Sequence, residues 1–502
     1  MSEEGEFTKV EVADKLLKAS PILQRSVAVA LLGAAQFGWM LSEMGHLPFN
    51  NASLCRQADI PEGQCLLYPG HTTAQWTMQS TAWALGGALG ALASAFLADT
   101  YGRKHTLGVN GLVMILGGLV QMLAPDMETF ALGRGVSGIA SGVAVNVLNN
   151  YLREVAPKQW RMFYMTLFHI TMGFTAVVVS ALMFAIPKVP TSAWQFKPLF
   201  GGPIVIGGLQ LATMRFIVES PMWLLHRHRD TEAKQAVSQL YMSGDIDIYF
   251  VELAESMRAQ TEESEAASSM LGLLVSPRYR VQFVIAVVLG TMQQLAGMSA
   301  LVVYGPSIFK AIGLADLRLA NIFMNYGRTH NMIIAALIGD RFNRRTLLVR
   351  LSVVMALAAL GFTLCQVYMN DTSKYVVLVM LIFCVTSYTL SVGSLGWLVS
   401  TELLPEALAP TSGSFATFGT WMAQLFIGVY FQQISSPTHW GTQAFAIFAV
   451  LTLLFAVLAY AYVPETRLTT TDQVTAIFTR DNQDMFDSIS TPKTPQTLES
   501  TP

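Results

Sequence analysis

Long apolar segments alternate with short polar ones along almost the whole chain. Each apolar segment is about 20 residues long, the length that an α-helix needs to cross the hydrocarbon core of a bilayer. Charged residues gather between these segments and rarely stand within them. The pattern predicts membrane-spanning helices at 26–47, 74–98, 106–124, 129–152, 162–187, 201–218, 281–304, 318–339, 346–369, 375–400, 412–434 and 442–463. We therefore expect an all-α integral membrane protein with twelve transmembrane helices.

One long polar stretch, 219–280, separates the first six apolar segments from the last six. Its pieces 231–242 and 250–264 have the apolar spacing of short amphipathic helices. The tail after residue 480 is rich in Ser, Thr and Pro, a composition typical of disorder. The predicted regions are a polar N-terminal segment 1–25, a six-helix bundle 26–218, a linker 219–280, a second bundle 281–463 and a partly disordered tail 464–502.

The two predicted bundles carry the same motif at the same place. Asp99-Thr-Tyr-Gly-Arg-Lys104 follows the second apolar segment, and Asp340-Arg-Phe-Asn-Arg-Arg345 follows the eighth, about 240 residues later. A second echo places Glu219 just after the sixth segment and Glu465 just after the twelfth. Internal repeats of this size in an apolar chain are typical of transporters built from two related halves.

Composition and charge agree with a membrane protein. Apolar residues make up 52% of the chain and charged residues 13%, whereas a soluble domain carries roughly 25% charge. The net charge of −2 gives no reason to expect a nucleic-acid partner. Most Lys and Arg residues fall in alternate polar segments, which places both termini in the cytosol. Residues 1–25 are polar and lack a cleavage site, so they do not form a signal peptide.

This topology makes 48–73 the longest outer loop. It holds Cys55 and Cys65, a candidate disulfide outside the cytosol, and Asn51, which begins an Asn-x-Ser glycosylation sequon. No phosphate loop, metal-ligand cluster or nucleophile–base arrangement stands out, so we expect no cofactor, no metal and no enzymatic activity. We expect a monomer in the plasma membrane, with the vacuolar or lysosomal membrane as the alternative.

Several motifs, taken in order along 26–478, resemble the sugar-porter family of the major facilitator superfamily. The matching runs are Asp99, Gly102, Arg103 and Lys104; Arg134 and Glu154; Glu154, Pro157 and Arg161; Val218-Glu-Ser-Pro-Met-Trp-Leu224; Gln293-Gln-Leu-Ala-Gly-Met-Ser299; Trp397 and Glu402; and Pro464-Glu-Thr466. Each is weak alone, but their order and spacing together are specific. The resemblance implies two six-helix bundles around a central cavity that opens alternately to the two sides of the membrane.

The resemblance also implies a site where amides and one Trp bind the hydroxyl groups of a sugar. Amides suit hydroxyls because each offers a donor and an acceptor. The matching residues are Gln293, Gln294, Trp397 and Gln424, while His169, Ser299, Arg328, Thr389 and Thr420 stand where the family carries Gln, Asn, Asn, Glu and Asn. Except for Thr389, we take these residues as candidate substrate contacts. Helix–helix hydrogen bonding is the alternative role for the two glutamines.

Charged residues of the repeated motifs fall at the expected cytosolic ends of the helices. They are Asp99, Arg103, Arg134, Glu154, Arg161 and Glu219 in the first half, and Asp340, Arg344, Arg345, Glu402 and Glu465 in the second. We expect ion pairs that hold the halves together while the outside is open and that part when the inside opens. Exposed pairs are worth roughly 0–1 kcal/mol each, which suits a reversible latch. Ordinary solvated loop charge is the alternative.

Arg328 falls near the middle of the segment 318–339. A charged residue at this depth is costly, and functional use is the default interpretation. Two interpretations stay open: Arg328 binds an anionic substrate such as a sugar acid, or it is neutralised by a carboxylate, by backbone carbonyls or by water. Glu43 is a candidate partner.

The first span also bears on energy coupling. Proton-coupled relatives generally carry Phe-Gly-Tyr-Asp there, and this chain has Phe37-Gly-Trp-Met40, in which Met40 cannot take a proton. The sequence thus favours facilitated diffusion of a sugar or sugar-like hydroxylated solute. One alternative is proton-coupled transport of a sugar acid or other organic anion, with Glu43 and His169 as candidate proton sites. A nutrient receptor that does not transport is the second alternative.

Overall fold

The structure is a computed structural model, in which the described residues are almost entirely helical. It describes residues 17–43, 68, 71–157, 160–186, 195, 197–242, 246–264, 270–301, 317–338, 342–367, 373–405, 408–431, 434, 440–467 and 471–478. Four sequence candidates lie outside these residues: Asn51, Cys55, Cys65 and Asp340.

The first group of helices covers the first six predicted spans. It consists of α2 (Pro21–Glu43), α3 (Thr73–Tyr101), α4 (Arg103–Leu123), α5 (Met127–Val155), α6 (Arg161–Leu182) with η2 (Met183–Ala185), and the continuous run of η4 (Lys197–Gly201), α7 (Gly202–Thr213) and η5 (Met214–Phe216). Helices α3 and α4 both pack against α5, and α2 packs against α5, α6 and α7.

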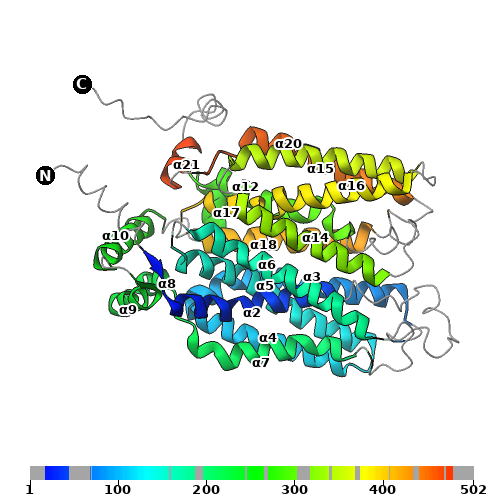
Figure 1. Cartoon of the computed structure of the whole chain (residues 1–502). Helices are drawn as coiled ribbons and strands as arrows, with labels where there is room; N and C mark the ends of the chain where they lie inside the picture. Colours follow the sequence, from blue (N-terminus) through cyan, green and yellow to red (C-terminus); the bar gives the residue numbers. More distant parts are fainter. Residues whose placement is uncertain are drawn as a thin grey trace.

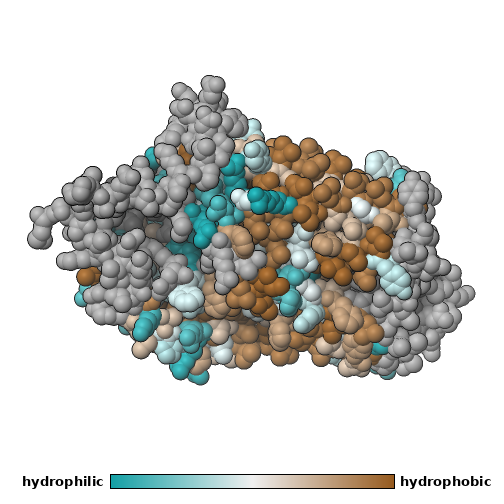
Figure 2. All heavy atoms as spheres, turned by 45° about the horizontal axis from the view of Figure 1, so that its top comes forward, coloured by the Kyte–Doolittle hydropathy of each residue, from teal (hydrophilic) through white to brown (hydrophobic). Residues whose placement is uncertain are grey.

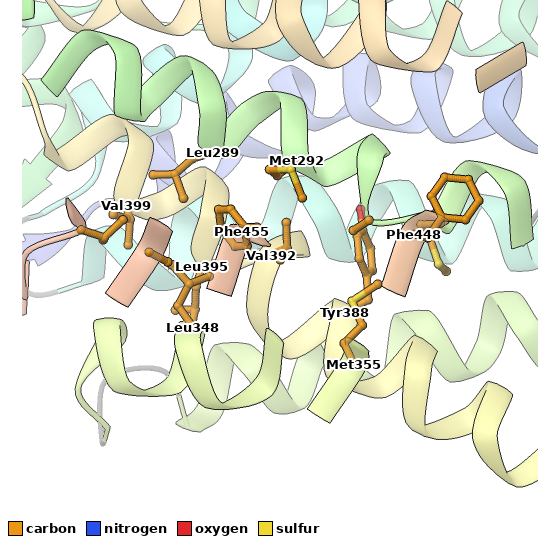
Figure 3. Packing of buried hydrophobic residues seen from close by; sticks show 14 of the residues in the cluster. Leu289, Met292, Leu348, Met355, Tyr388, Val392, Leu395, Val399, Phe448 and Phe455 are labelled. Atoms are coloured by element: carbon orange, nitrogen blue, oxygen red, sulfur yellow. The ribbon is translucent and has the colours of Figure 1, made fainter. Parts of the chain in front are cut away.

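The second group covers the last six spans. It consists of α12 (Arg280–Leu295), α14 (Leu317–Ile338), α15 (Arg344–Val367), α16 (Ser373–Tyr388) with η7 (Thr389–Gly393) and α17 (Leu395–Glu402), α18 (Ala409–Phe426) with η8 (Ile427–Phe431), and η9 (Gly441–Phe445) with α20 (Ala446–Tyr462). Helix α12 packs against α17, α18 and α20, and α15 packs against α16 and α20. Leu289, Leu348, Val392 and Phe455 belong to its shared apolar core (Figure 3).

Among the described residues, nine helical segments are long and apolar enough to cross a membrane. Helices α2, α14 and α18 lie at the three remaining predicted spans but carry more polar residues, such as Gln36, Asn325 and Thr417. Gln36 and Thr417 are buried against other helices, whereas α14 also exposes large apolar side chains such as Phe323 and Leu337. Large apolar side chains are exposed along most of the helices, and Figure 2 shows a broad hydrophobic face.

Short elements gather at one end of the molecule, which we call the linker end (Figure 1). They are α8 (Pro221–His226), α9 (Asp230–Leu240), α10 (Ile246–Ser264), α11 (Met270–Val275), α21 (Thr471–Phe478) and the strands β1 (Lys18–Ala19) and β2 (Tyr241–Met242). The sequence predicts a helix over 231–242, but α9 ends at Leu240 because Tyr241 and Met242 pair antiparallel with Ala19 and Lys18. This pairing ties the linker to the start of α2.

The two groups meet along two seams. Helix α18 packs against α3 and α5, and α14 packs against α6. The second seam is close: a Cβ added at Gly173 of α6 would lie 2.6 Å from the Thr329 hydroxyl oxygen of α14. Asn325 of α14 donates a hydrogen bond of 3.0 Å to Ser180 of α6. The candidate substrate residues lie on these seam helices and on their neighbours α12 and α17.

Candidate functional site

Five of the candidate substrate residues lie on or beside three mutually packed helices. Gln293 and Gln294 stand in the last turn of α12, Trp397 in α17, and Thr420 and Gln424 in α18. Helix α12 ends here because Gly297 adopts φ +90°, where an added Cβ would lie 2.6 Å from the ring of Phe448. The break places the two glutamine side chains at an interrupted helix, where side chains can reach into a cavity.

Some of these polar groups already have protein partners. The Ser299 hydroxyl donates to the Gln294 side-chain oxygen, which bridges the break after α12. The Thr420 hydroxyl donates to the Gly290 carbonyl at 2.8 Å and thereby joins α18 to α12. Ser299 and Thr420, which the sequence nominates as substrate contacts, therefore make helix-stabilising hydrogen bonds in this conformation.

Two other donors in this region have no partner. Gln293 Nε2 and Trp397 Nε1 are buried and make no hydrogen bond within the described part of the chain. A buried donor without an acceptor costs roughly 1–3 kcal/mol. Such a cost is expected in a binding site, where the ligand supplies the missing acceptor.

Trp397 lies where the two groups of helices meet. It is only 5% exposed and belongs to the same buried cluster as Phe168 and Met172 of α6 and Met332 of α14. The π-helical segment η7 precedes it, and Ser394 separates η7 from α17. Local π-helical turns are frequent at functional sites.

His169 and Arg328 face each other across the seam between α6 and α14. Arg328 stands at the middle of α14, is half-buried, and is close enough to His169 and Tyr388 for electrostatic interaction. Its Nε is buried and has no hydrogen-bond partner in the described part of the chain. Tyr388 ends α16, within the core cluster that also holds Met292 and Met355 (Figure 3).

Glu43, the partner considered for Arg328, pairs instead with Arg134. Glu43 Oε1 and Arg134 Nη1 lie 2.8 Å apart, and both side chains are almost fully buried. Arg134 Nε also donates to the Gln79 carbonyl oxygen at 3.2 Å. The prediction that Arg134 belongs to the cytosolic-end cluster is wrong. Arg134 lies near the start of α5, five to six turns or roughly 30 Å from Glu154 near its end.

The first charge cluster, Asp99, Arg103, Glu154 and Glu219, lies at the linker end. Arg103 forms a two-pronged contact with Glu154, with Nε to Oε2 at 2.9 Å and Nη2 to Oε1 at 2.8 Å, and reaches Asp99 at 3.2 Å. Glu219 accepts hydrogen bonds from the backbone N–H groups of Arg103 and Lys104, the first residues of α4. Burial raises the pKa of the Glu219 carboxyl, and these backbone bonds oppose the rise.

The second charge cluster, Arg344, Arg345, Glu402 and Glu465, repeats this geometry. Arg344 pairs with Glu402 of α17, and Glu465 accepts from the backbone N–H groups of Arg344 at 3.0 Å and Arg345 at 3.1 Å. In both groups, a carboxylate that follows the last helix caps the N-terminus of the helix that starts within the charged motif. Glu219 caps α4, and Glu465 caps α15. Negative charge at a helix N-terminus is favourable because the helix dipole is positive there.

The ion pairs of both charge clusters named here lie within one group each, whereas the sequence analysis expects pairs between the halves. Two contacts do cross at the linker end. Glu402 is close enough to Arg161 of α6 for electrostatic interaction, and Arg153 Nη1 donates to the Thr401 carbonyl oxygen at 3.2 Å. Arg344 and Arg161 thus both act on Glu402, which connects the second charge cluster to the first group.

A buried hydrogen-bond network between the groups escaped the sequence analysis. Asn146 Nδ2 of α5 donates to Ser94 of α3 at 2.8 Å and to Ser414 of α18 at 2.9 Å. The two serine oxygens lie 2.9 Å from each other. The available signal was a lone Asn in the apolar run Gly-Val-Ala-Val-Asn-Val-Leu, but only the fold shows that it faces the other group.

One groove in the described part of the chain has the wrong chemistry for a sugar. An apolar groove of about 520 Å³ lies between α12 and α20, lined by residues such as Val284, Val288 and Leu458 with Arg280 and Tyr462. Apolar walls suit an acyl chain better than a hydroxylated solute. The polar candidates Gln293, Trp397 and Arg328 do not line it.

Comparisons with known proteins define the class. The family model described as "Sugar (and other) transporter" matches residues 26–478. The human solute carrier family 2, facilitated glucose transporter member 4 is 28% identical over 491 residues, covering 95% of this chain and 94% of the relative. Chicken facilitated glucose transporter member 1 is 26% identical over 468 residues, covering 91% and 93%.

Solved structures agree with the fold. The major facilitator superfamily proton:xylose symporter XylE, bound to 6-bromo-6-deoxy-D-glucose, superposes with a TM-score of 0.78 at 19% identity, covering 92% of this chain and all of that one. The inward-open xylose transporter XylE from E. coli gives 0.68 at 18% identity, covering 90% and 98%.

The chain therefore belongs to the sugar (and other) transporter family. Its fold is the major facilitator fold, with twelve transmembrane helices in two pseudo-symmetric six-helix bundles. The two groups of helices described above are these bundles. The family is one of transporters rather than enzymes, and the protein is a multi-pass membrane transporter.

Proposed function

We propose that this transporter carries a sugar or a sugar-like hydroxylated solute through a site between its two bundles. The observation that carries the proposal is a pair of buried donors on the packed helices α12 and α17, Gln293 Nε2 and Trp397 Nε1, for which the described residues supply no acceptor. Sugar hydroxyl oxygens would supply both acceptors, and the indole would offer its apolar face to the ring. The names of the relatives, which include glucose and xylose transporters, support this substrate class.

We propose alternating access with the seams α18–α3/α5 and α6–α14 as the moving surfaces. The charge clusters would hold each bundle rigid at the linker end, while Glu402 and Arg161 connect the two bundles. The regions 26–218 and 281–463 would then move as units joined by the linker 219–280. Weak contacts between units suit a transition that must reverse in every cycle.

We propose facilitated diffusion as the mode of transport. Met40 is fully buried and has no ionisable group at the position where proton-coupled relatives carry Asp. Glu43, one turn further along α2, is engaged by Arg134.

One observation favours proton coupling as a second candidate. Glu43 is a carboxylate buried within a membrane helix, and its Oε2 has no hydrogen-bond partner in the described part of the chain. Protonation of Glu43 would break its ion pair with Arg134 and could couple solute movement to a proton.

For orientation, we propose that the linker end faces the cytosol and that the protein is a monomer in the plasma membrane. The linker end carries Arg103, Lys104, Arg227, Arg344 and Arg345, as the positive-inside rule requires.

Uptake by purified protein in liposomes tests the proposal. We expect labelled D-glucose to enter until it equilibrates, and to be exchanged by internal glucose in a counterflow assay. An inward proton gradient should not produce accumulation. Accumulation that E43Q abolishes while counterflow persists would establish the proton-coupled alternative. Absence of uptake and counterflow by correctly folded protein, for both hexoses and pentoses, would contradict the sugar proposal.

A further inference from the structure

We propose that the preferred substrate carries a carboxylate and that Arg328 binds it, so that the protein selects sugar acids such as hexuronates over neutral sugars. This inference rests on the proposed function and specifies the substrate class of the same site. It starts from a cationic side chain at the middle of α14, on the seam between the bundles.

Arg328 has no compensating charge in the described part of the chain. Within that part, the phenol of Tyr388 and the imidazole of His169 interact electrostatically with it, and neither group is an anion at neutral pH by its ordinary pKa. Glu43 is engaged by Arg134 at 2.8 Å. A guanidinium enclosed by protein without a counter-ion is costly, and binding of an anion relieves that cost.

Other buried arginines of this chain show what a structural role looks like. Arg318, ten residues earlier on the same helix, reaches the carbonyl oxygens of Met183 and Ile186 at 3.5 and 3.2 Å. Arg103 pairs with Glu154 and Arg134 pairs with Glu43. Arg328 differs from all three because its buried Nε has no partner within the described part of the chain.

The surroundings fit a hydroxylated anion rather than a simple inorganic one. Trp397 shares a buried cluster with Met332, which follows Arg328 by one turn of α14 on the same face, and with Phe168, the neighbour of His169. The donors of Gln293 and Trp397 suit hydroxyls, and the planar guanidinium suits the two oxygens of a carboxylate. A sugar ring with one carboxylate uses both kinds of donor.

Uptake of matched sugars tests this selectivity. Labelled D-glucose and D-glucuronate are presented to wild-type, R328Q, R328K and R318Q proteins in liposomes, with D-glucuronamide as a neutral competitor of the same shape. We expect wild-type protein to favour glucuronate. R328Q should lower the ratio of glucuronate to glucose uptake by about 10- to 100-fold, the range for losing a charged hydrogen bond. R328K should lower this uptake ratio less than R328Q does, and R318Q should leave the wild-type ratio unchanged.

The outcomes separate the two proposals. If wild-type protein transports glucose while glucuronate neither enters nor inhibits, the inference about the carboxylate is wrong and the proposed sugar transport stands. If R328Q and R318Q change the ratio equally, Arg328 does not select the substrate. If folded wild-type protein transports neither compound, both proposals fail. If R328Q does not fold, competition on the wild-type protein decides the question. Stronger inhibition of labelled-glucose uptake by glucuronate than by glucuronamide supports the inference, and equal inhibition contradicts it.

Discussion

The candidate site is distinguished by which polar side chains lack protein partners. Thr420 and Ser299 satisfy their hydroxyl groups within the second bundle, whereas Gln293 and Trp397 each present a buried donor that no described residue accepts. Unsatisfied atoms also occur elsewhere among the described residues, for example at Gln36 and Gln210, so the position of Gln293 and Trp397 on the packed helices α12 and α17 is what marks them. The residues that bind substrate are therefore expected among the unsatisfied donors, and the satisfied ones stabilise the broken helices around them.

Substitution of the two unsatisfied donors should impair transport. We expect Q293A to lower the efficiency of solute uptake roughly two- to tenfold, which corresponds to one neutral hydrogen bond of about 0.5–1.5 kcal/mol. W397A should lower it at least as much, because the apolar face is lost as well. Initial rates in liposomes at equal protein content measure both effects.

Exposed residues of the same types provide the controls. Gln235 on α9 and Trp440, which is 58% exposed, lie away from the site. Q235A and W440A should leave uptake unchanged. Normal uptake by Q293A and W397A would remove these residues from the substrate site.

The buried pair Glu43–Arg134 makes a prediction about stability. Removal of one partner leaves the other charge buried and unpaired, at a cost of roughly 3–5 kcal/mol. E43Q and R134Q should each lower the melting temperature of the detergent-solubilised protein clearly, and the double variant should recover part of the loss. Strictly additive losses in this double-mutant cycle would show that the pair does not interact.

The sequence identifies the important polar residues of this site more reliably than it identifies their contact partners. The depth of Arg328 and the motif glutamines follow from the chain, because membrane helices have a regular rise and few polar residues. The partner of Glu43 does not, since Arg134 is about 90 positions away along the chain. Pairing depends on how α2 rotates against α5, which apolar spacing alone does not specify.

At the scale of elements, each bundle caps one helix with a carboxylate that follows its last helix. Glu219 contacts the first N–H groups of α4, and Glu465 contacts those of α15. At the first of these sites the chain turns at Gly102, with φ +87°. A Cβ at Gly102 would lie 2.4 Å from Glu219 Oε2, so glycine leaves room for the cap.

The variant G102A should therefore lose stability by roughly 1–3 kcal/mol, because it combines an unfavourable φ with displacement of the capping carboxylate. Uptake should fall with it. Gly208 of α7 is the matched control, since an added Cβ there meets nothing within 4 Å. G208A should preserve or slightly raise the melting temperature. Equal melting temperatures for the two variants would contradict the role of Gly102.

The repeated motif made this cap partly predictable. Its recurrence places Glu219 and Glu465 near the charged motifs, but the sequence analysis assigned them to a latch between the halves. The structure instead shows that they bind backbone N–H groups within their own halves. A motif gives the type and position of a charge, whereas its partner depends on the direction in which the chain leaves the last helix.

At the scale of the whole molecule, polar contacts join the two bundles near the linker end. Asn146 binds Ser94 and Ser414 together across the α3–α5–α18 seam. Arg153 contacts the Thr401 carbonyl oxygen, and Glu402 interacts with Arg161. These contacts must separate if this end is to open.

The sequence predicts twelve spans and two halves, but it does not predict these contacts between the halves. A packed seam and a lipid-facing surface can both contain isolated small polar residues.

Restriction of this seam by a reversible crosslink tests alternating access most directly. The side-chain oxygens of Ser94 and Ser414 lie 2.9 Å apart, so the double variant S94C/S414C is suited to form a disulfide between the bundles. Solute uptake is measured in liposomes after oxidation and again after reduction, with S94C and S414C alone as controls and mass spectrometry to quantify the crosslink. We expect uptake to disappear in the crosslinked protein and to return on reduction, while both single variants transport throughout. Full uptake by fully crosslinked protein would contradict the account, because solute would then cross without separation of the two bundles at the linker end.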